Sequence, residues 1–180
     1  MSEIEVPIES VQEEMQHHAV HSNESLLTIG ALLSAFLAVL AAVAALNAGH
    51  HANEAMIEQI QASDHWGHYQ AKAIKASILD AKRDILASLG KPMSEESQDK
   101  REKYKSDQEE IQKEATEAQE SSLKHLAIHQ MLAKAVTFCQ VAIGITAIAV
   151  LVRRKSFLYV SSTFGVVGLF YLIKGLFFLP

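Results

Sequence analysis

The chain has 180 residues, of which 49% are hydrophobic, and it carries a formal net charge of −5. The acidic balance and the lack of a basic patch exclude nucleic acid as a natural partner. The one cysteine, Cys139, lies inside an apolar run, which excludes a disulfide framework and a thiolate metal site.

Residues 1–24 predict an acidic amphipathic helix. The segment contains glutamates but no Lys or Arg, and its apolar residues follow a spacing of three or four that lines one helical face. Because an acidic helix binds anionic lipid surfaces poorly, we expect this stripe to pack on protein. The stretch "SNES" at 22–25 predicts a break and an N-cap before the next helix. The apolar stripe consists of Ile4, Ile8, Val11 and Met15.

Three apolar runs follow along the chain. Each is long enough, at about 1.5 Å per residue, to cross a hydrocarbon layer of about 30 Å. The third contains Lys174 near its end, where a lysine can reach the membrane surface. If these runs were buried core helices of a soluble protein, the chain would need many more amphipathic segments to pack around them than it has. Segments 25–46, 135–152 and 157–179 are therefore predicted to be transmembrane helices.

Small residues recur on two of these runs. Ser161, Gly165 and Gly168 share one face of the third run, and such faces let helix backbones approach closely in lipid. The first run has small residues at every fourth position, which fits either a packing face or a generic alanine-rich sequence. Those positions are Gly30, Ser34, Ala38 and Ala42.

Residues 47–134 predict a long antiparallel helical hairpin between the first two transmembrane helices. The turn falls near 90–93, in "LGKPMSEES". Gly90 suits the left-handed position after a helix, Pro92 prevents continuation, and Ser94 caps the next helix. The predicted fold is thus an all-α membrane protein with three transmembrane helices and a projecting hairpin.

The predicted seam between the two arms of this hairpin follows a seven-residue spacing. It is thin, because alanine and polar residues dominate it, so we expect other subunits or residues 1–24 to complete the bundle. The protein is accordingly predicted to be a homo-oligomer. The seam residues are Ile57, Ile60, Ala71, Ile74, Ile78, Ala81 and Ile85 on the first arm, and Tyr104, Ile111, Ala115, Ala118 and Leu132 on the second.

The charges near the apolar runs indicate an orientation. The short loop 153–156 carries three positive charges, and short basic loops stay in the cytoplasm. The N-terminus would then also be cytoplasmic and the hairpin periplasmic. The reverse orientation has support too, since residues 1–24 lack positive charges and both Lys124 and Lys134 flank the second run on the hairpin side.

Two stretches carry a resemblance to a known family. They are "AGHHANEAMIEQIQASDHWGHYQAKAIKASILDAKRDIL" and, much later, "RRKSFLYVS". The sequence resembles a bacterial family catalogued as domain of unknown function 4337, over nearly the whole chain, and "GHHANEAM" is the most specific part. The resemblance implies a bacterial three-span membrane protein, which we expect in the inner membrane. It implies no activity.

Six of the nine histidines lie in residues 47–134. On the first arm His50, Glu54 and Glu58 step by four along one face, and on the second His125 and His129 do the same. A turn centred between Lys91 and Pro92 places His129 opposite Glu54 and His125 opposite Glu58. Imidazole and carboxylate pairs on facing helices can bind zinc, iron or manganese, so these five residues are a candidate metal site.

Two further points qualify this hypothesis. A metal site needs neighbours that orient its ligands, and His51 or Asn53 could do so. The plainer interpretation is a polar seam at the membrane surface, in which histidine and glutamate side chains form hydrogen bonds. Asp64 and His68 also share a face, but Trp66 and Tyr69 beside them suggest aromatic packing.

A similar face recurs in residues 1–24, where Glu14, His18 and His21 lie together. In the orientation above, it is on the opposite side of the membrane from the candidate metal site.

The motifs of common enzymes do not occur, so we expect no enzymatic activity. Three functions remain open. The favoured one is a structural or interaction scaffold that binds itself, the bilayer and another membrane or periplasmic protein. The second is a divalent-metal-binding or metal-sensing membrane protein. The third is an ion-conducting oligomer. Only the architecture suggests it, since the three apolar runs contain no Asp or Glu.

Overall fold

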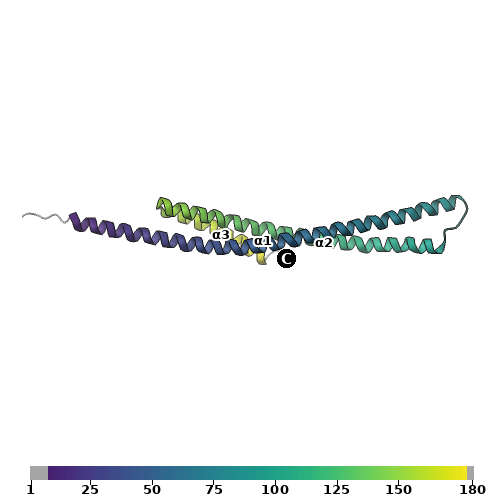
Figure 1. Cartoon of the computed structure of the whole chain (residues 1–180), viewed down its shortest axis with the longest axis horizontal. Coiled ribbons are helices and arrows are strands. Elements are labelled where there is room, and N and C mark those ends of the chain that lie inside the picture. The colour runs from purple at the N-terminus through teal and green to yellow at the C-terminus, as the bar shows by residue number, and fades with distance from the viewer. Residues whose placement is uncertain (1–7, 178–180) are drawn as a thin grey trace, which may run out of the picture. The chain divides into compact units, whose positions relative to one another are not determined.

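The computed structural model describes the backbone of residues 8–177 and the side chains of residues 25–177. This part of the chain is entirely helical and contains three helices, α1 (Ile8–Ser88), α2 (Glu95–Val152) and α3 (Lys155–Phe177) (Figure 1). The helices form two compact units. Unit 1 comprises residues up to Ala48 and from Gln130 onward, and unit 2 is Gly49–His129. Helices α1 and α2 contribute to both.

Helix α1 continues through residues 22–25, so the break predicted at "SNES" does not occur. The segment contains neither Gly nor Pro, and Ser and Asn disfavour a helix only weakly when good helix formers flank them. The side chains of the predicted apolar stripe, and those of Glu14, His18 and His21, lie outside the residues that the structure describes at that level.

The turn between α1 and α2 follows from its sequence. Gly90 has φ of 67°, the left-handed conformation predicted for it. The amide of Lys91 donates to the carbonyl of Leu86 at 2.9 Å, which closes the end of α1. Helix α2 then begins at Glu95, and the Ser94 carbonyl accepts from the amides of Ser97 and Gln98. The Ser94 hydroxyl donates to the Ser97 hydroxyl at 2.9 Å.

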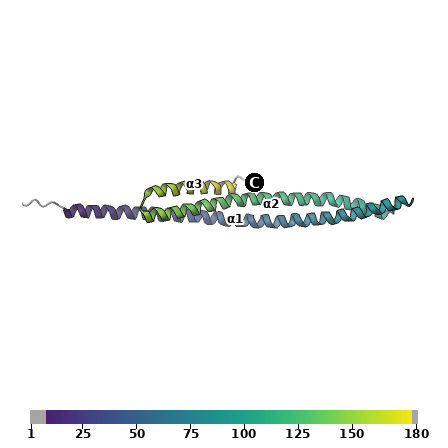
Figure 2. The same cartoon turned by 90° about the horizontal axis from the view of Figure 1, so that it is seen from above.

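In unit 1, α3 lies alongside α2 (Figure 2). A buried cluster contains Leu37 and Ala41 of α1 with Cys139 and Ala142 of α2, and Phe164 of α3 packs against it. Two buried hydroxyls join α2 to α3. The Ser161 hydroxyl donates to the Ala142 carbonyl at 2.7 Å and lies 2.6 Å from the hydroxyl of Thr146.

Small residues set the spacing of these helices. Ser161, Gly165 and Gly168 are buried, as the sequence predicts for α3. On α1 the packing face is present only in part, because Gly30 is buried and Ser34 half-buried, whereas Ala38 and Ala42 are exposed. A strict step of four drifts around a helix with 3.6 residues per turn, so it cannot stay on one face. The buried stripe instead mixes steps of three, four and seven: Gly30, Leu37, Ala41, Ala44 and Ala48.

Each helix contains a stretch long and apolar enough to cross a membrane. The mean hydropathies of these stretches are 2.6 in α1, 2.3 in α2 and 1.7 in α3. The structure buries only 22% to 28% of their residues. Many large side chains are exposed as a result, including Leu46 at 77% and Leu151 at 83%.

In unit 2, α1 and α2 run side by side in opposite directions. Lys72 forms an ion pair with Asp107, and Arg101 forms one with Asp80. The residues buried between the helices are mostly small, with Ala55, Ala62 and Ala76 on α1 and Ala115 on α2. Alanine lets the two backbones approach closely enough for the polar side chains at the edges to meet.

The predicted seam is therefore correct for α2 and wrong for α1. Ala115 is buried, and Tyr104, Ile111 and Ala118 are half-buried. All seven residues predicted to form the seam on α1 are exposed, and its isoleucines retain 48% to 61% of their surface. Helix α1 has two faces with seven-residue spacing, and the alanine face, not the isoleucine face, contacts α2.

We expect Gly168→Ala to destabilise unit 1 by about 1–3 kcal/mol, because overpacking forces neighbouring atoms apart. A Cβ at Gly168 would lie 2.8 Å from the Cys139 Sγ and 3.3 Å from the Ala135 carbonyl oxygen. Gly144→Ala is the matched control, since a Cβ there meets nothing within 4 Å. The control should raise stability by up to about 1 kcal/mol through helix propensity. Thermal unfolding of the solubilised variants measures both, and equal effects would contradict this account.

Candidate functional site

The candidate site lies within unit 2, where α1 and α2 contribute histidine, glutamate and serine side chains. The Ser122 hydroxyl is buried and donates to the Ala55 carbonyl at 2.7 Å. This bond spans the alanine contact and sets the axial position of α2 against α1. It brings residues 50–58 of α1 opposite residues 121–129 of α2.

His51 and His125 form the centre of the site. Their Nδ1 atoms lie 2.8 Å apart, and their ring centroids lie 5.0 Å apart. Two imidazole nitrogens at this distance share one proton, so one ring donates and the other accepts. The pair is part-buried and therefore only partly screened by water.

Glu58 extends this arrangement on the other side of His125. Its Oε1 atom lies 3.8 Å from the Nε2 of His125 and accepts a hydrogen bond from the Ser121 hydroxyl at 2.7 Å. Its Oε2 atom is buried and accepts no hydrogen bond from the described residues. His125 thus lies between the ring of His51 and the carboxyl group of Glu58.

The surroundings lower the pKa of His51 below its ordinary value of 6.5. Partial burial is the largest cause, because it disfavours the charged ring. The nearby charges of His125, His50 and His129 act in the same direction, and Glu54 opposes them. The ring of His50 is close, with its centroid 5.3 Å from that of His51.

Of the five residues predicted to bind a metal ion, Glu58 and His125 lie 3.8 Å apart, and the ring of His50 lies beside that of His51. The charges of Glu54 and His129 also act on His51. Residues 25–177 contain no group of three or more His, Cys, Asp or Glu side chains that could hold a metal ion.

The register of the two helices differs from the predicted one. Lys72 pairs with Asp107, and Asp80 pairs with Arg101. Facing residues are therefore equally far along the chain from a point close to Gly90, not from a point between Lys91 and Pro92. This difference shifts α2 by about one helical turn relative to α1. His51, predicted only to orient a ligand, faces His125, and Glu58 lies near His125 as predicted. Ser121 and Ser122 were not predicted, although their short hydroxyls suit a close helix contact.

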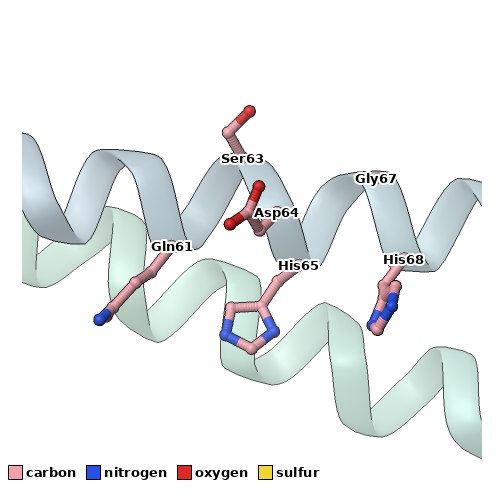
Figure 3. A pocket seen from close by; sticks show the side chains of 6 residues that line it. All are labelled: Gln61, Ser63, Asp64, His65, Gly67 and His68. Carbon is pink, nitrogen blue, oxygen red and sulfur yellow. The ribbon is translucent and has the colours of Figure 1, made fainter.

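A second polar group lies farther along α1, around a hollow of about 550 Å³ (Figure 3). Its lining residues all belong to α1. His65 points towards α2, where its Nδ1 lies 3.2 Å from an Oε2 of Glu114. Trp66 and Tyr69 make the predicted aromatic contact, edge to face at 5.5 Å. The lining consists of Gln61, Ser63, Asp64, His65, Gly67 and His68.

Comparison with known proteins establishes the family. Residues 26–178 match the family described as a domain of unknown function (DUF4337). The match covers most of the chain, so the protein belongs to this family, as the resemblance in its sequence indicates. Neither a curated protein nor a solved structure matches the chain.

Acid should destabilise the contact between α1 and α2 through His51. Its pKa is lower in the folded protein than in the unfolded chain, so the unfolded state binds more protons. This contribution to stability is complete above about pH 6.5 and declines as the pH falls below that value. We expect His51→Asn to reduce the loss of melting temperature in acid, measured by circular dichroism. His68→Asn, an exposed site on the same helix, should behave like the unmodified protein. Identical pH profiles for all three proteins would contradict this role of His51.

Proposed function

We propose that the protein is a non-enzymatic integral membrane protein that acts as a homo-oligomeric scaffold in a bacterial inner membrane. The observation that carries this proposal is the low burial of three long apolar stretches. A soluble protein rarely exposes apolar patches of more than a few hundred Å². Lipid would cover side chains such as Leu32, Val39 and Phe170, which are 61% to 67% exposed.

The packing inside unit 1 supports a lipid environment. Lipid tails are as apolar as leucine, so helices in a bilayer associate through small residues and hydrogen bonds between helices. Glycines of α3 and the hydroxyls of Ser161 and Thr146 make contacts of this kind. Residues 25–46, 135–152 and 157–179 are the proposed membrane-spanning segments.

A scaffold function agrees with the character of unit 2. Its helices contact each other through alanines, and polar side chains such as Ser121 and Glu58 form hydrogen bonds across the contact. Exposed isoleucines provide surface for association with other protein molecules. The proposed partners are further copies of this chain and another membrane or periplasmic protein.

We expect the protein, purified in mild detergent, to have the mass of several copies when measured by light scattering coupled to size exclusion. Small-residue helix faces and the exposed apolar side chains of unit 2 both favour association. A detergent-corrected mass of one copy across the accessible concentration range would contradict the scaffold proposal.

We further propose that the basic turn between α2 and α3 is cytoplasmic and that residues 47–134 are periplasmic. Arg153, Arg154 and Lys155 provide the positive charges that hold a short loop inside. In a Cys139→Ala background, Lys91→Cys should react with an impermeant thiol reagent once the outer membrane is open. Ser156→Cys is the control and should react only after the inner membrane is opened. The reverse pattern would invert the proposed orientation.

A further inference from the structure

The most conspicuous surface of unit 2 is an isoleucine stripe on α1, which we call the isoleucine seam. Its members are 48% to 61% exposed, although isoleucine is among the residues most often fully buried in proteins. The seam consists of Ile57, Ile60, Ile74, Ile78 and Ile85.

The seam faces away from α2. Ala55, Ala62 and Ala76 mark the face of α1 that α2 covers, and they are 1% to 6% exposed. Steps of 100° per residue place the seam roughly opposite that face. Helix α2 has no comparable stripe: between Glu95 and Glu120, its described residues expose no large hydrophobic side chain. Where α1 pairs with this part of α2, the uncovered apolar surface therefore belongs to α1.

The spacing of the seam identifies the kind of partner. Ile57, Ile78 and Ile85 occupy position a of a heptad repeat, and Ile60 and Ile74 occupy position d. Ala71 and Ala81 continue the same two positions and are also exposed. A repeat of this kind over about four heptads is the pattern by which helices pack knobs into holes. The matching surface would be another helix with the same spacing.

We propose that the isoleucine seam binds the isoleucine seams of further copies of this chain, in parallel and in register. This inference deepens the proposed scaffold function and rests on it, since copies anchored in one membrane with the same orientation present their α1 helices in parallel. The positions beside the seam allow this arrangement. In a parallel bundle Gln70 would face Lys75 and Ser77 would face Lys82, so no like charges meet there.

The middle of the seam is not apolar, and it would specify the register of the bundle. Asp64 and Gly67 take the a and d positions between Ile60 and Ala71, and both line the hollow on α1 (Figure 3). A polar residue at one a position costs stability but specifies register. Isoleucine at both a and d favours three or four strands over two. The structure thus points to a bundle of three or four copies, with Asp64 marking the register.

Cysteine cross-linking tests the seam directly. Full-length protein in detergent, in a Cys139→Ala background, carries Ile74→Cys or Ser106→Cys as matched single changes. Disulfides form only where Cα atoms approach within about 7 Å. We expect mild oxidation to link Ile74→Cys between copies, and Ser106→Cys, exposed on the outer face of α2, to stay unlinked. Equal linking of the two, or none at Ile74→Cys while the protein is oligomeric, would overturn the proposal.

A second experiment separates failure of the seam from failure of the scaffold function. We expect the double change Ile74→Asp and Ile78→Asp to lower the mass measured by light scattering at concentrations where the unmodified protein is oligomeric. Leu123→Asp is the control on α2, since Leu123 is 56% exposed but lies off the seam, and it should keep the mass unchanged. If the double variant keeps the full mass, the seam proposal fails and the scaffold proposal survives. If the unmodified protein is a monomer, both fail.

Discussion

The close approach of helix backbones at alanine, glycine and serine is the constraint on which both units depend. In unit 1, a Cβ at Gly168 or Gly175 would lie 2.8 Å from a side-chain atom of α2. In unit 2, alanines are the residues that α1 buries against α2. At this separation a serine hydroxyl reaches a carbonyl on the neighbouring helix, as Ser122 and Ser161 do. Hydrogen bonds and dispersion between backbones stabilise contacts that contain few large side chains.

The same constraint leaves the large apolar side chains on the outside. A helix that uses its small residues for contacts within the chain presents its leucines, isoleucines and phenylalanines to the surroundings. In unit 1 these surroundings would be lipid, to which such side chains are well suited. In unit 2 they would be water unless another protein covers the isoleucines, and that difference is the reason for assigning the two surfaces different partners.

The histidine cluster is a product of the thin contact in unit 2. Two helices that meet through alanine keep their flanking polar groups near the surface, where water can still reach them. The Nδ1 atoms of His51 and His125 then lie 2.8 Å apart, and Glu58 lies beside His125. The lowered pKa of His51 makes this contact sensitive to acid.

The sequence by itself determined the helical character of the chain, the turn at Gly90, the three long apolar stretches and the family. Periodicity and turn chemistry are local properties, so they can be recognised without a partner surface. Only the tertiary structure decided which face of α1 contacts α2 and which residue faces His125. Helix α1 has two faces with seven-residue spacing, one formed by Ala55, Ala62 and Ala76 and the other by the isoleucine seam. The local sequence pattern does not show which of the two contacts α2. The register depends on the turn geometry and on contacts such as that of Ser122 with Ala55, and for this reason the sequence alone did not place His51 beside His125.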